Sequence, residues 1–161
     1  MKVKELYIRK PNRLQGYDYS QSGIYFVTIC SKDRHELFSQ IVVGDGLARP
    51  ELTDIGKEIC NMIEYANNRF NECKIVQYVI MPNHVHLLIQ IAGRASPSPT
   101  VGNIVGGIKS GVSRIVGFSP WQRSFHDHIV RCDEEYHRIV EYIQNNPALW
   151  QEDCFYPTYP A

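Results

Sequence analysis

The sequence lacks several features that would place it in particular classes of protein. No apolar stretch approaches the roughly 20 residues that a membrane-spanning helix needs. The N-terminus is polar and basic with no apolar core behind it, so no secretory signal is visible. The five cysteines are odd in number, and none forms a C-x-x-C pair. These absences predict a cytoplasmic protein with reduced thiols and no membrane partner.

The sequence also has no net charge, with 17 basic and 17 acidic residues. A neutral total argues against nucleic-acid binding, because attraction to phosphate usually leaves a basic excess. The basic residues are unevenly placed, however. Segment 1–13 holds five of them against Glu5 alone, and segment 109–131 holds four more. A neutral total is therefore compatible with a basic face.

The 161 residues suit a single domain spanning 1–161, in which 1–22 form a basic N-terminal arm. Runs of β-branched and aromatic residues predict strands at 23–30, 74–81, 84–91 and 125–131. Apolar residues at helical spacing predict a helix that Thr53 or Asp54 caps and that reaches Phe70, and further helices at 101–116 and 133–146. Residues 31–51 are expected to form a loop. This order predicts an α+β fold: a ferredoxin-like split β-α-β antiparallel sheet with an added C-terminal helix.

Two histidines occupy alternate positions of the third predicted strand. His84 and His86 project to one face, because residues i and i+2 of a strand do so. Together they could bind one divalent metal, and with two ligands the site would keep open positions, as catalytic sites do. Taken alone, the H-x-H spacing favours polar residues on a half-exposed strand face.

The last predicted helix carries a tyrosine at the edge of its apolar stripe. Tyr142 and Asn146 are four residues apart and share a face, with Arg138 one turn earlier. A phenol has a pKa near 10 and is a poor nucleophile at neutral pH, but a metal ion on a phosphate would assist its attack. Taken alone, the pattern favours a tyrosine that packs its ring at the border of the core.

Several segments in order resemble one family. "VIMPNHVHLLI" resembles the His-hydrophobic-His strand of HUH single-tyrosine (Y1) transposases. "RIVEYIQNNPALW" is similar to the tyrosine helix of their REP-associated branch. "RLQGYDYSQSGIYFVTIC", "VGNIVGGIKSGVSRI" and "WQRSFHDHIVR" resemble other blocks of that branch. Each motif is weak alone, but their joint order is specific.

The resemblance implies a transposase that cleaves and rejoins single-stranded hairpin DNA through a 5′-phosphotyrosine bond. It implies that Tyr142 is the nucleophile and that His84, His86 and Asn146 bind Mg²⁺ or Mn²⁺. Some relatives have an acid where this chain has Asn83, so weaker metal binding is expected. His128, Trp121 and Arg131 match recurring positions of the branch, and for His128 a structural and a functional role are both open. Relatives act as monomers or exchange tyrosine helices across a homodimer, and the sequence does not choose between these.

Single-stranded DNA binding needs a basic groove with aromatic faces for the bases. Tyr17, Tyr19 and Tyr25 could supply such faces or could pack in the core. The basic residues expected to contact DNA are Lys4, Arg9, Lys10, Arg13, Lys109, Arg114 and Arg131.

Three other functions compete with this interpretation. A metal-dependent hydrolase would use the same histidines, but it would need acidic ligands that residues 81–92 do not contain. A phosphate loop at "GNIVGGIKS" is disfavoured, because Ile108 separates Gly107 from Lys109. A non-catalytic hairpin-binding protein derived from a transposase is the strongest alternative.

Overall fold

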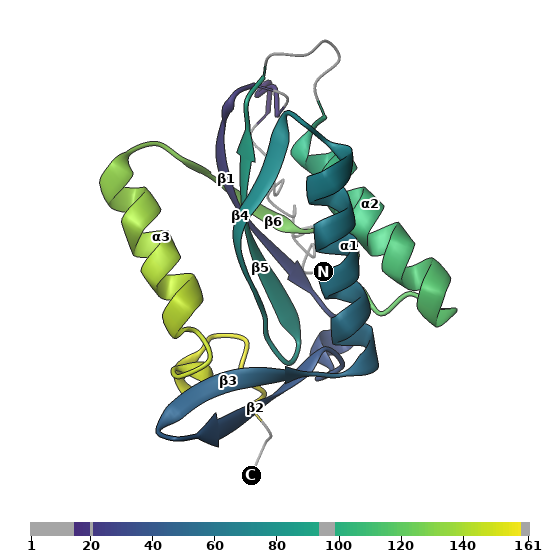
Figure 1. Ribbon diagram of the computed structural model, residues 1–161, viewed down its shortest axis with the longest axis vertical. Coiled ribbons are helices and arrows are strands. Elements are labelled where there is room, and N and C mark those ends of the chain that lie inside the picture. The colour runs from purple at the N-terminus through teal and green to yellow at the C-terminus, as the bar shows by residue number, and fades with distance from the viewer. Residues whose placement is uncertain (1–14, 20, 94–98, 159–161) are drawn as a thin grey trace, which may run out of the picture.

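The fold is built on one four-stranded antiparallel sheet. The computed structural model describes residues 15–19, 21–93 and 99–158. The strand order is β4-β5-β1-β6, formed by β1 (Gly23–Cys30), β4 (Cys73–Ile80), β5 (His84–Ile91) and β6 (His126–Val130). Helices α1 (Asp54–Arg69) and α2 (Val101–Val116) cover one face, and α3 (Asp133–Asn145) covers the other (Figure 1). The predicted ferredoxin-like α+β fold with an added C-terminal helix is confirmed.

Side-chain caps define where the first two helices begin. The hydroxyl of Thr53 accepts a hydrogen bond from the Gly56 amide, which confirms Thr53 as the cap of α1. Thr100 and Asn103 form a reciprocal capping box at the start of α2. The glycines of α2 are tolerated in part because Gly111 lets Met62 of α1 approach closely. Local caps and close packing therefore offset the weak helix propensity of this segment.

The alternation of side chains in β5 divides the interior into two cores. Its odd-numbered residues face α1 and α2 in the larger core, which includes Val85 and Leu87. Leu88 faces α3 in a smaller core, whose other buried members are Val79, Met81, Ile143 and Trp150. His84 and His86 share the face of Leu88, so they lie on the α3 side of the sheet.

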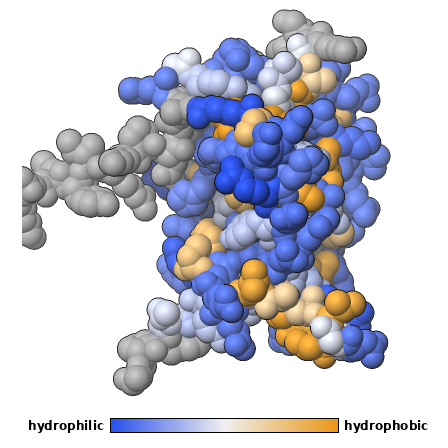
Figure 2. Space-filling model, turned by 90° about the vertical axis from the view of Figure 1, so that its left-hand side faces the viewer, coloured by the Kyte–Doolittle hydropathy of each residue, from blue (hydrophilic) through white to orange (hydrophobic). Residues whose placement is uncertain are grey.

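Residues 39–52 form a β-hairpin, so the loop predicted for this part of 31–51 is wrong. Strands β2 (Ser39–Gly44) and β3 (Leu47–Leu52) pair through a two-residue turn. Asp45 and Gly46 both have positive φ, of 52° and 77°, as a type I′ turn requires. The hairpin lies at the lower end of the molecule in Figure 1, the end where hydrophobic residues gather on the surface in Figure 2. Val43 and Leu47 flank its turn and are exposed.

Two short 3₁₀ helices complete the described chain, at Lys32–Arg34 and Trp150–Glu152. All five cysteines are free. Within the ranges described above, no helix has the length and apolarity to cross a membrane.

Gly56→Ala is expected to destabilise the protein by about 2–3 kcal/mol, as overpacking of a tight contact does. A Cβ at this position would lie 2.0 Å from the carbonyl oxygen of Phe38, which is backbone and cannot rotate away. Urea denaturation of the variant measures the change. Gly107→Ala is the matched control, because a Cβ there meets nothing within 4 Å. It should raise helix stability by up to about 1 kcal/mol, and an equal loss in both variants would contradict the steric explanation.

Candidate active site

The two histidines of β5 lie side by side in the interior beneath α3 and the chain that follows it. His84 and His86 are 0% and 1% exposed, and their ring centroids are 4.6 Å apart. Phe155 packs on the His84 ring at 4.4 Å. The pairing expected from their spacing is therefore observed, but the face is fully covered rather than half-exposed.

Hydrogen bonds to Asn83 fix the orientation of His84. The Asn83 amide nitrogen donates to the carbonyl oxygens of Phe155, at 2.8 Å, and Arg34, at 3.3 Å. The Asn83 Oδ1 must then accept from His84 Nδ1, which lies 2.9 Å away. In a neutral ring with its proton on Nδ1, Nε2 keeps a free lone pair, which is the form that binds metal.

His86 has one ring nitrogen bonded and one without a partner. Its Nδ1 lies 2.8 Å from the Thr28 hydroxyl. Its Nε2 is buried and has no hydrogen-bond partner among the residues that the structure describes. A buried polar atom without a partner is costly unless an ion or a water satisfies it. The Nε2 atoms of both histidines are therefore suited to bind a cation.

Two oxygen donors lie beside these nitrogens. Asn146, immediately after α3, is 2% exposed and places its Oδ1 3.3 Å from His84 Nε2. Its Nδ2 donates to Asp153 Oδ2 at 2.6 Å, which fixes the direction of the amide. Asp153 Oδ2 is 3.9 Å from His84 Nε2. Ligand atoms of His84, His86 and Asp153 all lie within 4.8 Å of one another.

Sequence reasoning missed Asp153. It follows Pro147 in an irregular segment, where no strand or helix spacing relates it to the histidines. The cluster therefore contains an acidic group, although residues 81–92 have none. Missing acidic ligands are then no longer an argument against a metal-dependent hydrolase.

The protonation states of these groups fit a divalent cation. Burial lowers the pKa of His84 to about 4, although Asp153 and Asn146 oppose the shift. Burial also lowers the pKa of His86 well below its usual range, and His84 adds to that effect. Both imidazoles are then neutral at pH 7, as metal ligands must be. Without a cation, the lone pairs of His84 Nε2 and Asn146 Oδ1 face each other. The donor set of imidazole, amide and carboxylate suits Mg²⁺ or Mn²⁺.

Tyr142 lies beside the histidines of its own chain. Its ring centroid is 5.2 Å from that of His86 and 6.1 Å from that of Phe26, yet the residue is 41% exposed. Burial raises the pKa of Tyr142 to about 12, Asp153 and Cys154 add to the rise, and a hydrogen bond with Asn146 opposes it. The phenol therefore borders both the polar cluster and solvent, but it needs help to ionise.

The predicted DNA-contacting residues are dispersed. Lys4, Arg9, Lys10 and Arg13 lie outside the described residues. The Lys109 amine donates to the carbonyl oxygens of Gln122, at 2.8 Å, and Ser124, at 3.0 Å. Arg114 is exposed on α2, across the sheet from Tyr142, and Arg131 is exposed between β6 and α3.

The three tyrosines and His128, whose roles the sequence left open, have structural contacts. Tyr25 is fully buried, and the rings of Tyr17, Tyr19 and Tyr25 pack on one another at 5.1–6.4 Å. Core packing therefore accounts for Tyr25. His128 Nε2 lies 2.5 Å from Glu135 Oε1 and links β6 to α3.

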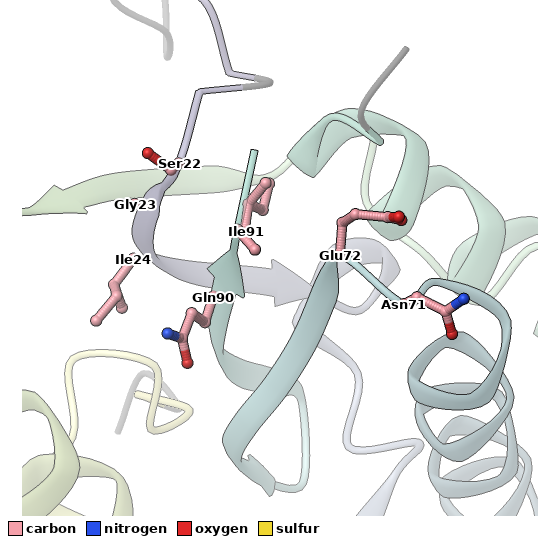
Figure 3. Close-up of a pocket in the computed structure, with 8 residues that line it drawn as sticks. Ser22, Gly23, Ile24, Asn71, Glu72, Gln90 and Ile91 are labelled. Carbon is pink, nitrogen blue, oxygen red and sulfur yellow. The ribbon is translucent and has the colours of Figure 1, made fainter. Parts of the chain in front are cut away.

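A cavity of about 570 Å³ lies at the other end of the sheet, near the end of β5. Its polar side chains do not converge: Gln90 points to one side, and Asn71 and Glu72 point to the other (Figure 3). The convergent polar groups are those around His84.

Comparisons with known proteins identify the family and the fold of the chain. The family model for IS200-like transposases matches residues 20–146. The chain therefore belongs to the family of IS200-like transposases. A protein of Haemophilus influenzae described as uncharacterized is 34% identical, and the match covers 92% of this chain and 93% of that protein.

A solved structure has the same fold. It is a REP-associated tyrosine transposase bound to a REP hairpin, with a TM-score of 0.64 and 20% identity, and the match covers 84% of this chain and 73% of that one.

Proposed function

We propose that this transposase cleaves and rejoins single-stranded hairpin DNA through a 5′-phosphotyrosine bond on Tyr142, with Mg²⁺ or Mn²⁺ held by His84, His86 and Asn146. The observation that carries the proposal is the position of Tyr142. It lies against His86 on one side and against solvent on the other, so a DNA phosphate could reach the phenol at the edge of the buried cluster.

Each residue of the cluster has a distinct part in this proposal. His84 offers an Nε2 lone pair, because the Asn83 oxygen accepts from Nδ1. His86 Nε2 has no hydrogen-bond partner among the described residues, and it offers a lone pair when Nδ1 donates to the Thr28 hydroxyl. Asn146 offers its amide oxygen. We add Asp153 to the predicted set, because its carboxylate orients the Asn146 amide and brings negative charge within 3.9 Å of His84. Asn83 is then a positioning residue rather than a ligand.

The proposed reaction is a transesterification. The Tyr142 oxygen bonds to the phosphorus, and the bond from phosphorus to the 3′ oxygen breaks. The leaving 3′ oxygen takes up a proton and becomes a 3′ hydroxyl. The phenol loses its own proton as it attacks. With a pKa of about 12, only about one phenol in 10⁵ is ionised at pH 7. A bound metal ion would polarise the phosphate and stabilise phenolate character. The phosphotyrosine linkage is itself a phosphodiester, so the energy of the broken bond is conserved. A 3′ hydroxyl can therefore attack it and rejoin the strand without ATP.

The substrate part of the proposal rests on similarity and charge. The solved relative of the same fold is bound to a REP hairpin, and we propose that this chain belongs to the same branch and binds hairpins of palindromic repeats. Lys4, Arg9, Lys10, Arg13, Lys109, Arg114 and Arg131 remain the predicted DNA-contacting residues. Tyr142 packs on His86 of the same chain, an arrangement in which cleavage would need no residue of a second subunit.

A covalent adduct is the direct test. Incubation with single-stranded DNA from the palindromic repeats of its genome and Mn²⁺ should give a protein–DNA adduct that survives SDS and that EDTA prevents. A hydrolase would cut without an adduct, and a hairpin-binding protein would shift the DNA without cutting it. Cleavage that persists in EDTA would contradict the metal site.

A further inference from the structure

A pocket of about 380 Å³ lies between the 3₁₀ turn after β1 and the segment 119–123 that precedes β6. We propose that this basic pocket binds a backbone phosphate of the single-stranded DNA that continues past the cleavage site. The inference rests on the proposed function and extends it to a second contact with the same strand.

The pocket is rich in positive charge. Lys32 and Arg123 line it beside the carboxylate of Asp33, and Arg34 also lines it while its guanidinium lies over the Phe155 ring. Lys32 and Arg123 are exposed, and neither forms an ion pair with any residue in the described part of the chain. Unpaired ammonium and guanidinium groups around one hollow are the groups that bind phosphate.

The walls of the pocket are fixed by backbone contacts. The Lys32 amide donates to the Pro120 carbonyl at 2.8 Å, and the Gln122 amide donates to the Cys30 carbonyl at 2.9 Å. The Lys109 amine holds the carbonyls on both sides of Arg123. Lys109 therefore positions the wall that carries Arg123. A rigid site loses less conformational freedom when it binds a ligand.

Backbone strain gathers at the same place. Asp33 and Arg34 have φ of 54° and 56°, and Ser124, the residue after Arg123, has φ of 72°. Side chains with a Cβ seldom adopt this region, and such residues cluster at functional sites. Asp33 directly follows Lys32 and Ser124 directly follows Arg123, so a strained residue adjoins each cation that would meet the phosphate.

Arg34 connects the basic pocket to the candidate active site. Its guanidinium lies over the Phe155 ring, 5.1 Å from the centroid. Its carbonyl accepts a hydrogen bond from Asn83, which also bonds His84. Arg34 therefore joins the pocket to the covered side of His84, and we infer that a strand cleaved at the exposed Tyr142 could place a neighbouring phosphate in the pocket.

The pocket suits phosphate rather than a base. Trp121 lines it but is 5% exposed, and its indole nitrogen donates to the Lys109 carbonyl at 3.0 Å. Its ring is therefore not available to stack on a base. Binding there should be independent of DNA sequence, as phosphate contacts are.

The test removes the two unpaired cations. Lys32→Ala/Arg123→Ala should weaken binding of a fluorescent, unstructured oligothymidine about 10-fold in about 0.1 M salt. It should also reduce the slope of log affinity against log salt by about 1.4, or about 0.7 for each lost contact with a single strand. Fluorescence anisotropy over a series of salt concentrations measures both. Lys32→Arg/Arg123→Lys should retain most of the binding.

A matched control removes the same charge elsewhere. Lys57→Ala/Arg69→Ala lies on exposed positions of α1, across the sheet from α3, where Lys57 pairs with Asp54 and Arg69 donates to Tyr65. It should change the affinity less than 2-fold. Equal losses in the two double variants, or no oligothymidine binding by the unaltered protein, would overturn the basic pocket.

Failure of the pocket is distinguishable from failure of the proposed function. If the unaltered protein forms the SDS-resistant adduct while Lys32→Ala/Arg123→Ala binds oligothymidine normally, the pocket is wrong and the function stands. If no adduct forms but the double variant loses binding and salt dependence, the pocket stands and the cleavage proposal fails.

Discussion

Tyr142→Phe is expected to abolish the covalent protein–DNA adduct while the affinity for hairpin DNA changes less than 2-fold. The substitution removes only the hydroxyl that would bond to phosphorus, and the ring keeps its contacts with His86 and Phe26. With no nucleophile at that position, adduct yield should fall by more than about 10³-fold, as for loss of other covalent nucleophiles. Denaturing gels of labelled DNA measure the adduct, and anisotropy measures the affinity.

Tyr156→Phe is the matched control. Tyr156 is also a partly exposed tyrosine near the site, and its ring packs on Trp150 at 5.2 Å. This variant should form the adduct at the unaltered rate. An adduct that persists in Tyr142→Phe and disappears in Tyr156→Phe would reassign the nucleophile.

His84→Ala is expected to lose Mn²⁺ binding and adduct formation together. His84 Nε2 lies within 3.3–3.9 Å of the Asn146 and Asp153 oxygens, so its loss removes the centre of the donor set. Loss of a residue that only supports a ligand costs about 10–100-fold in metal affinity. A direct ligand should cost at least about 100-fold. Isothermal titration with Mn²⁺ measures this loss in the absence of DNA.

Two further variants separate ligand loss from damage to the fold. His137→Ala removes an exposed histidine of α3 and should leave Mn²⁺ binding unchanged. Asp153→Asn keeps the volume of the side chain but removes its charge, and it should weaken Mn²⁺ binding without creating a cavity. Normal Mn²⁺ binding by both His84→Ala and Asp153→Asn would refute the metal site.

Most of the fold follows from local patterns in the sequence. One face of β5 carries His84, His86, Leu88 and Gln90 and the other carries only apolar residues, and this alternation correctly assigns the two faces. The hairpin of β2 and β3 was missed, although Asp45-Gly46 is a strong signal for a two-residue turn. Its strands are short and lie outside the main sheet, so no long apolar run marks them.

The candidate site was only partly predictable, because half of it depends on tertiary packing. Spacing places His84 with His86 and Tyr142 with Asn146, since each pair lies in or next to one regular element. The docking of α3 on β5 brings the pairs together, and no local pattern encodes this. Asp153 and Phe155 come from an irregular segment that folds back over the histidines. The same segment explains why the histidines are buried rather than half-exposed.

One helix carries the proposed nucleophile and leads directly into a proposed metal ligand. Tyr142 lies on α3 one turn before Asn146, which follows the helix, whereas the histidines belong to the sheet. The smaller core, centred on Ile143, is what fixes the helix against that sheet. Any displacement of α3 would withdraw the Tyr142 phenol and the Asn146 amide from the histidines in the same movement. In the proposed mechanism, a tyrosine that moves away from the sheet would leave an incomplete metal site, so the nucleophile and its activating ion would be in place together or absent together.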